Sequence, residues 1–199
     1  MTAVPKKHWP WISGIIFAAC ACLFLAVVFM DEIFAVFEYD SYNAERLDSM
    51  TNIRRFGDEI KKYISEHNGR YPDKNGVHGL CQLEGIVRYS DLAAKNDRSV
   101  LPDHDVMRES NTSYAYVASG LSADRTDAPI PILFEKPWGR SRILVLMSDG
   151  NMRIIDNKDL KNCRQVIRYL QASSPGDLKV WNILNENAGS IDECQGQQK

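Results

Sequence analysis

The sequence predicts an α+β protein. An N-terminal transmembrane helix precedes a long amphipathic helix packed on a small antiparallel sheet, with helices at the C-terminal end. Three observations lead to this prediction. No residue from Trp9 to Met30 is charged. Apolar residues then recur every three or four positions between residues 44 and 67, which is the period of one helix face. Two later apolar runs are joined through Asp149-Gly150, which is typical of a β-hairpin.

The composition limits the class of protein. Of the 199 residues, 44% are hydrophobic and 25% are charged, which is ordinary for a globular chain with room for one membrane anchor and one modest domain. The formal net charge is −2. A mildly acidic chain without a cluster of Lys and Arg is not expected to bind nucleic acid.

The apolar segment 9–30 is long enough to cross a lipid bilayer. A helix of that length extends about 33 Å, and the hydrocarbon core of a bilayer is about 30 Å thick. Two lysines precede the segment and two acidic residues follow it. These flanking charges are Lys6, Lys7, Asp31 and Glu32. The positive-inside rule therefore places residues 1–8 in the cytoplasm and everything after Met30 outside.

Other interpretations of this segment are weaker. A cleaved signal peptide has a shorter apolar region and a small-residue cleavage site, which Phe29-Met30-Asp31 does not offer. The stretch Phe17-Ala18-Ala19-Cys20 resembles a lipobox, but the chain stays apolar as far as Met30. A buried core helix would be shorter or amphipathic. We therefore predict a retained single-pass anchor over 9–30, followed by a juxtamembrane connector over 31–43.

The extracytoplasmic domain is predicted over residues 44–187, and it begins with the amphipathic helix. The apolar face of that helix is formed by Leu47, Met50, Ile53, Phe56, Ile60 and Ile64. Asn68-Gly69 ends the helix, because glycine adopts a positive φ at little cost. Tyr71 and Pro72 belong to the extended segment that leaves it, since proline prevents the helix from restarting.

Strands and loops are predicted from residue composition. A short helix is expected within residues 77–95, followed by a polar loop over 95–113. The segment 113–117 contains Tyr114 and Tyr116 and reads as a strand. Residues 130–135 also read as a strand, in which Pro131 indicates either an edge position or a bulge.

The clearest strands flank Asp149 and Gly150. Residues 142–148 are apolar on both faces, so this strand is expected to be central, and residues 151–156 form its hairpin partner. Asp149 supplies turn chemistry, and Gly150 supplies a positive φ. Glu135, at the end of the preceding strand, either faces the tyrosine strand and accepts a hydrogen bond or lies on the surface.

The C-terminal part is predicted to be helical. One helix is expected to run to Leu170 with Asp156 or Asn157 as its N-cap, and a second to begin at Ser174-Pro175. Residues 188–199 are predicted to form a flexible tail. Cys163 and Cys194 flank these helices and form a candidate disulfide, although their spacing does not establish the pair.

No sequence motif indicates an enzyme or a bound cofactor. The chain lacks a phosphate-binding loop, a nucleophile elbow and a zinc-protease helix. His78 and Cys81 have metal-ligand spacing without a second pair, and Asp103-His104-Asp105 reads as a solvated charge run. Residues 73–76 offer too few oxygen ligands for calcium. We therefore predict no enzymatic activity, no cofactor and no metal.

The order of these elements resembles that of the pseudopilins, the prepilin-type proteins of type II secretion and type IV pilus systems. The segment IRRFGDEIKKYISEHNGRYPD, residues 53–73, is similar to the family's helix followed by Asn-Gly-x-Tyr-Pro. SYAYVASGL, residues 113–121, and the two strands between residues 132 and 156 resemble a large pseudopilin-like group of planctomycete and verrucomicrobial bacteria. The resemblance covers residues 44–160.

This resemblance implies a pilin-like head in the periplasm and an anchor in the inner (cytoplasmic) membrane. It implies a non-enzymatic assembly or scaffold component whose partners are the lipid bilayer and other pilin-like subunits or secretion-system inner-membrane proteins. Gly14 becomes the candidate leader cleavage site, but Ala19 stands where prepilins carry Glu, so cleavage is left open. Some pseudopilins hold calcium in a late loop, which draws attention to Asp124 and Asp127, although a solvated loop is expected there.

Two other functions are compatible with the sequence. The alternative to assembly is a single-pass membrane protein with an extracytoplasmic sensor or ligand-binding domain, which would need a partly apolar pocket. A hydrolase using His104 or the paired aspartates would need a base and a nucleophile within hydrogen-bond reach of each other.

Overall fold

The computed structural model describes residues 46–85, 92–93, 108–125, 128–156, 159–174 and 176–196. The predicted cytoplasmic segment, transmembrane helix and connector, residues 1–8, 9–30 and 31–43, lie outside the described residues, as does Gly14. Among the helices that are described, none is both long enough and apolar enough to cross a membrane.

The described part of the chain is an α+β domain built on a four-stranded antiparallel sheet. The strands are β1 (Tyr114–Tyr116), β2 (Pro131–Glu135), β3 (Arg142–Met147) and β4 (Met152–Asp156). They lie side by side in sequence order, so each strand pairs with the next one along the chain. The predicted fold class is confirmed at this level, and so is the hairpin through Asp149-Gly150.

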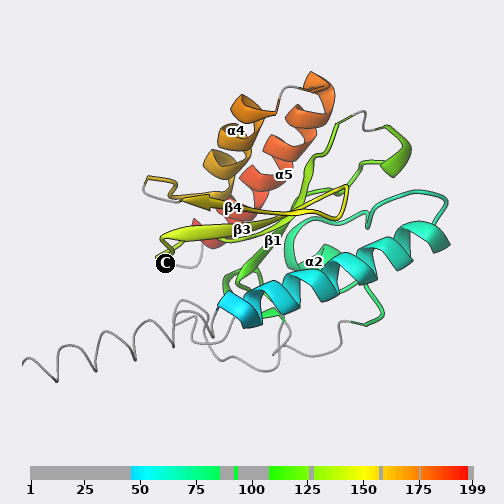
Figure 1. Ribbon diagram of the computed structural model, residues 1–199, viewed down its shortest axis with the longest axis horizontal. Helices are drawn as coiled ribbons and strands as arrows, with labels where there is room; N and C mark the ends of the chain where they lie inside the picture. Colours follow the sequence, from blue (N-terminus) through cyan, green and yellow to red (C-terminus); the bar gives the residue numbers. More distant parts are fainter. Residues whose placement is uncertain are drawn as a thin grey trace, which may run out of the picture. The chain divides into compact units, whose positions relative to one another are not determined.

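Helices cover both faces of the sheet (Figure 1). The helices α4 (Cys163–Ser173) and α5 (Leu178–Gly196) lie together on one face, and the helix of residues 46–66 crosses the other. A strand covered on both faces hides both of its sets of side chains. All of β2 and all of β3 beyond Arg142 are accordingly buried, and β3 is central as predicted.

The helix of residues 46–66, called the long helix below, packs on the sheet through Ile53, Phe56 and Ile60, which are fully buried. The ring of Phe56 meets Tyr114 edge-on, with 5.1 Å between ring centroids. Leu47, predicted on the same face, is 64% exposed. It stands six positions before Ile53, and at about 100° per residue its side chain projects roughly 120° away from the buried stripe.

The Asn-Gly stop of the long helix is confirmed. Helical residues end at position 66, and Asn68 and Gly69 adopt left-handed φ angles of 53° and 76°. The Gly69 amide donates to the carbonyl of Ile64 over 3.0 Å, which satisfies one of the carbonyls left without a partner at a helix end.

The predicted edge position of residues 130–135 is wrong, because β2 lies between β1 and β3. The other prediction for Pro131, a bulge, fits the structure, since the pairing of β2 with β3 shifts register between Pro131 and Leu133. Pro131 is the first residue of the strand, where its missing N–H removes no internal ladder bond.

Helix boundaries differ from the prediction in three places. Of the described residues within 77–95, those up to Leu80 belong to α2 (Gly76–Leu80), residues 81–85 form turns, and Leu92 is helical. Gly76 and Gly79 within α2 and Gly85 in the turns weaken helix formation. The described 3₁₀ turns are η1 (Glu109–Asn111) and η2 (Ala123–Arg125).

The two C-terminal helices begin later than predicted, at positions set by other capping residues. The Asn162 side chain accepts a hydrogen bond from the Gln165 amide over 2.9 Å and caps α4. Asp177 accepts from the Lys179 amide over 2.8 Å at the start of α5. These side chains satisfy N–H groups that a helix start would otherwise leave unpaired.

The predicted flexible tail over 188–199 is also wrong as far as Gly196, because α5 continues to that residue. Leu184, Ala188 and Ile191 continue one apolar face and are at most 2% exposed. Burial of that face explains why the chain stays helical there.

Candidate functional site

The segment that leaves the long helix is tied to the loop after β1. Arg70 forms an isolated bridge with Ser122, and the Ala123 amide donates to the Gly69 carbonyl over 2.8 Å. The hydroxyl of Tyr116 donates to the Pro72 carbonyl over 3.2 Å. Gly69, Pro72 and Tyr116, which the sequence assigned structural roles, are therefore brought together.

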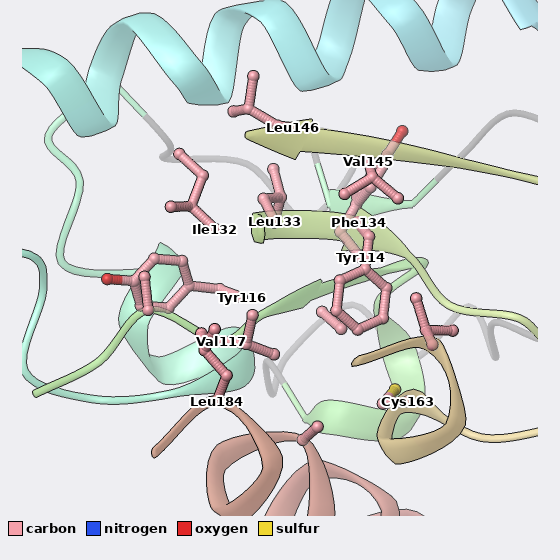
Figure 2. Close-up of a cluster of buried hydrophobic side chains, with 14 of the residues drawn as sticks. Tyr114, Tyr116, Val117, Ile132, Leu133, Phe134, Val145, Leu146, Cys163 and Leu184 are labelled. Atoms are coloured by element: carbon pink, nitrogen blue, oxygen red, sulfur yellow. The ribbon is translucent and has the colours of Figure 1, made fainter. Parts of the chain in front are cut away.

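Three tyrosines are buried in the domain, and Figure 2 shows two of them, Tyr114 and Tyr116, among apolar side chains of the core. Burial raises the pKa of Tyr71 to about 12 and holds the pKa of Tyr116 well above its ordinary value. Burial also raises the pKa of Tyr114, whose hydroxyl accepts a hydrogen bond from the Asn52 side chain over 3.3 Å. All three tyrosines are neutral packing groups at ordinary pH.

Glu135 is buried and accepts a backbone hydrogen bond, as one of the two sequence interpretations expected. Its Oε2 accepts from the Leu144 amide of β3 over 3.0 Å, rather than from a group on the tyrosine strand. Its Oε1 lies 3.1 Å from Nη1 of Arg140. This carboxylate therefore stabilises the junction of β2 with β3.

The hairpin turn uses the residues that were predicted for it. Gly150 has a φ of 82°, and both carboxylate oxygens of Asp149 accept hydrogen bonds from Asn151, over 3.0 and 2.8 Å. The hydrogen bond from the Asn151 amide is the main reason that the pKa of Asp149 is lowered.

A buried ion pair between Glu109 and Lys136 was not found from the sequence. The Lys136 Nζ lies 2.7 Å from Glu109 Oε1 and 5.0 Å from the centroid of the Trp138 ring. Glu109 Oε2 accepts from the Val77 amide over 2.7 Å, so the pair connects η1 to α2 and to the end of β2. Glu109 falls in a segment predicted as a polar loop, where no local signal marks a buried residue.

The predicted disulfide between Cys163 and Cys194 is wrong, because both cysteines are free. Cys163 points into the core at the start of α4 (Figure 2), whereas Cys194 is exposed on α5. Burial is the main reason that the pKa of the Cys163 thiol is well above its ordinary value. Burial, followed by the charge of Glu109, also raises the pKa of Cys81.

The structure gives no support to the metal-ligand patterns. Within the described ranges, no three His, Cys, Asp or Glu side chains are grouped so that they could hold a metal ion. Asp103-His104-Asp105 and Asp127 lie outside those ranges. Asp124 instead packs against Gly69, where an added Cβ would be 3.0 Å from its Oδ2.

A groove of 370 Å³ lies between the long helix and the β3–β4 hairpin, and we call it the helix–hairpin groove. Apolar side chains form its floor. They are Ile60, Ile132, Leu146, Met147 and Met152. Arg54, Asp58 and Lys61 line it from the long helix, and the hairpin contributes Ser148, Gly150 and Asn151. Such a mixture of an apolar floor and a few polar groups is typical of a ligand pocket.

No protein-family model matches the chain, and comparisons with curated proteins and with solved structures found no significant match. The likeness to pseudopilins therefore stays a prediction. Within the described ranges, the candidate sites are the helix–hairpin groove, the buried Glu109–Lys136 pair and the partly exposed Glu135–Arg140 pair.

Proposed function

We propose that the protein is a non-enzymatic, membrane-anchored component of the pseudopilin type. Its apolar segment 9–30 spans the inner membrane once, and its α+β domain lies in the periplasm. There it serves in assembly or scaffolding with pilin-like subunits or inner-membrane proteins of a secretion or pilus system.

The observation that carries this proposal is the packing of the long helix on the sheet. The helix follows the apolar segment in the chain and is fixed to the domain by Ile53, Phe56 and Ile60, all fully buried. Burial of three large side chains contributes several kcal/mol, at about 1.5–3 kcal/mol each. The long helix is thus firmly attached to the sheet, as we expect of the element that follows a membrane anchor in the chain.

The buried charges also support a scaffold over a hydrolase. Glu109 is paired with Lys136, and Glu135 is paired with Arg140. Both carboxylates accept backbone hydrogen bonds as well, from Val77 and Leu144. Carboxylates that are tied to a cation and to a backbone amide in this way hold a fold together and are poorly placed to act as an acid or a base. His104, which the hydrolase alternative needs, lies outside the described residues.

Membrane insertion is tested by fractionating bacteria that express the full chain. We expect the protein in the membrane pellet after carbonate extraction, with Cys81 and Cys194, both exposed, labelled by a membrane-impermeant maleimide added to spheroplasts. The matched variant Leu23→Arg/Val27→Arg places two charges in the apolar segment and is expected to release the protein. Recovery of the wild-type chain in the soluble fraction would reject the anchor.

Assembly is tested separately by site-specific photo-crosslinking in cells. A crosslinker at exposed Leu47, on the first helical turn, is expected to form adducts with prepilin-type subunits or secretion-system membrane proteins. The same crosslinker at buried Leu184 is the control for non-specific capture. If Leu47 and other exposed positions yield adducts with none of these proteins, the assembly role is wrong even when the anchor is correct.

A ligand-binding head is the second candidate, and the helix–hairpin groove favours it. Its volume of 370 Å³ lies at the lower end of the range of about 300–1,000 Å³ typical of ligand pockets.

A further inference from the structure

We propose that the helix–hairpin groove binds a small amphipathic monoanion. The apolar part of the ligand lies on the floor of the groove, and its carboxylate meets Lys61 at the mouth, which Arg54 also lines. This inference deepens the second candidate function and rests on it, but it is independent of the membrane anchor and of pilin-like assembly.

The floor of the groove gives the apolar half of the ligand a surface. Ile60 is fully buried, Leu146 is 3% exposed, and Met152 is half-buried. Figure 2 shows Ile132 and Leu146 on the side of the sheet that faces the long helix. Contact with this surface removes apolar area of the ligand from water, which favours binding.

The mouth of the groove carries two cations that have no partner in the part of the chain that the structure describes. Arg54 and Lys61 stand two helical turns apart, about 10 Å along the long helix. Neither makes an ion pair or a hydrogen bond within the described ranges. A Cβ added to Gly150 would lie 2.9 Å from the Lys61 Nζ, so the ammonium reaches from the helix to the hairpin turn. An unpaired cation beside an apolar floor complements a carboxylate attached to an apolar group.

The charge and the volume narrow the ligand class. Asp58 also lines the groove, between Arg54 and Lys61 on the same helix, and leaves the three side chains with one net positive charge. That balance favours a monoanion over a phosphate dianion. A volume of 370 Å³ suits a medium-chain or aromatic carboxylic acid and is too small for a phospholipid.

The test uses octanoate as the probe and octanamide as its uncharged counterpart. The full chain is held in lipid nanodiscs, binding is measured by titration calorimetry, and empty nanodiscs correct for partition into lipid. We expect the wild type to bind octanoate about tenfold more tightly than octanamide, because a charge-assisted hydrogen bond is worth about 1.5 kcal/mol or more.

Substitutions at three exposed positions on the long helix distinguish binding in the groove from a general effect of the protein's charge. Lys61→Met is expected to weaken octanoate binding about tenfold and to leave octanamide binding unchanged. Asp58→Asn is expected to tighten octanoate binding, since it removes a like charge from the mouth. Lys62→Met is the matched control, because Lys62 pairs with Glu84 and does not line the groove. It is expected to leave the affinity for octanoate unchanged.

Each contrary result has a distinct meaning. Equal binding of octanoate and octanamide to the wild type would overturn the anion preference and leave the ligand-binding head standing. Failure of both probes to bind would overturn the inference and the second candidate function together. Octanoate binding that Lys61→Met and Asp58→Asn leave unchanged would place the ligand elsewhere and overturn the proposed site.

Discussion

Lys136 and Glu109 form an ion pair in the interior of the domain, with 2.7 Å between Nζ and Oε1 and side chains that are only 2% and 8% exposed. Glu109 lies in the turn η1 and Lys136 directly follows β2, and the Val77 amide of α2 completes the cluster. The pair therefore holds η1, α2 and the residue after β2 together.

Lys136→Met is expected to destabilise the domain strongly. It leaves the carboxylate of Glu109 buried without its cation, and loss of one partner of a buried pair costs about 3–5 kcal/mol of unfolding free energy. Urea denaturation followed by circular dichroism measures this loss. Adding Glu109→Leu to Lys136→Met removes the stranded charge and is expected to restore much of the stability.

Lys62→Met is the control for that experiment. The Lys62–Glu84 pair is exposed on both sides, so we expect the denaturation midpoint to stay where it is in the wild type. If the midpoint moved as far for Lys62→Met as for Lys136→Met, the buried Glu109–Lys136 pair would contribute no more to the unfolding free energy than an exposed pair does.

Gly69→Ala and Gly120→Ala form a matched pair of backbone tests. Both glycines have a φ of 76°, but an added Cβ meets the Asp124 carboxylate at 3.0 Å only at Gly69 and meets nothing within 4 Å at Gly120. Each alanine is expected to cost about 1–2 kcal/mol of unfolding free energy, because L residues avoid the left-handed region. Gly69→Ala is expected to cost more. Equal losses in thermal melts would mean that the contact with Asp124 is irrelevant.

The stability of the domain is expected to fall in alkali. The pKa of Tyr71 is raised to about 12 from an ordinary value of 10, so the folded state keeps a proton that the unfolded state loses. This contribution is fully present below pH 10 and is lost as the pH rises toward 12. Melting temperatures measured across this range should therefore decline, and Tyr71→Phe should make the decline shallower. Tyr169→Phe, at an exposed position, is the control and should follow the wild type.

Cys163 is expected to resist alkylation while the domain is folded. Its side chain is fully buried and its pKa is raised, so little reactive thiolate is accessible. Brief treatment with iodoacetamide followed by peptide mass spectrometry should modify Cys194, which is exposed, before Cys163. In denaturant the two should react alike. Recovery of a Cys163–Cys194 linked peptide from the native protein would contradict the structure.

Local signals in the sequence predict much of this fold. The Asp149-Gly150 turn, the Asn68-Gly69 stop and the buried stripe of the long helix each depend on neighbours within a few residues, and the structure contains all three. The errors concern contacts between distant segments. The start of α4 differs from the prediction because several polar residues before it could serve as its cap, and Asp192 of α5, which accepts from the Cys163 amide, adds a distant contact next to Asn162 that the local sequence does not reveal.

The same distinction applies to the candidate sites. Glu135 could be singled out because it lies at the end of an apolar strand, but its partner Leu144 depends on the pairing of β2 with β3. The helix–hairpin groove is formed by the long helix and a hairpin some ninety residues later, roughly the separation of Lys61 from Gly150. Local sequence patterns do not predict a contact between segments so far apart in the chain. The sequence predicted a pocket only as a requirement of the sensor alternative, without naming its residues.

The carboxylate of Asp192 accepts hydrogen bonds from the amides of Cys163 and Arg164, over 2.8 and 3.0 Å, and so completes the first turn of α4. During synthesis, α4 leaves the ribosome before the side chain that finishes its first turn. We therefore expect α4 to dock stably on the sheet only after residue 192 has emerged, so that the apolar face of β2 and β3 beneath it stays uncovered until then.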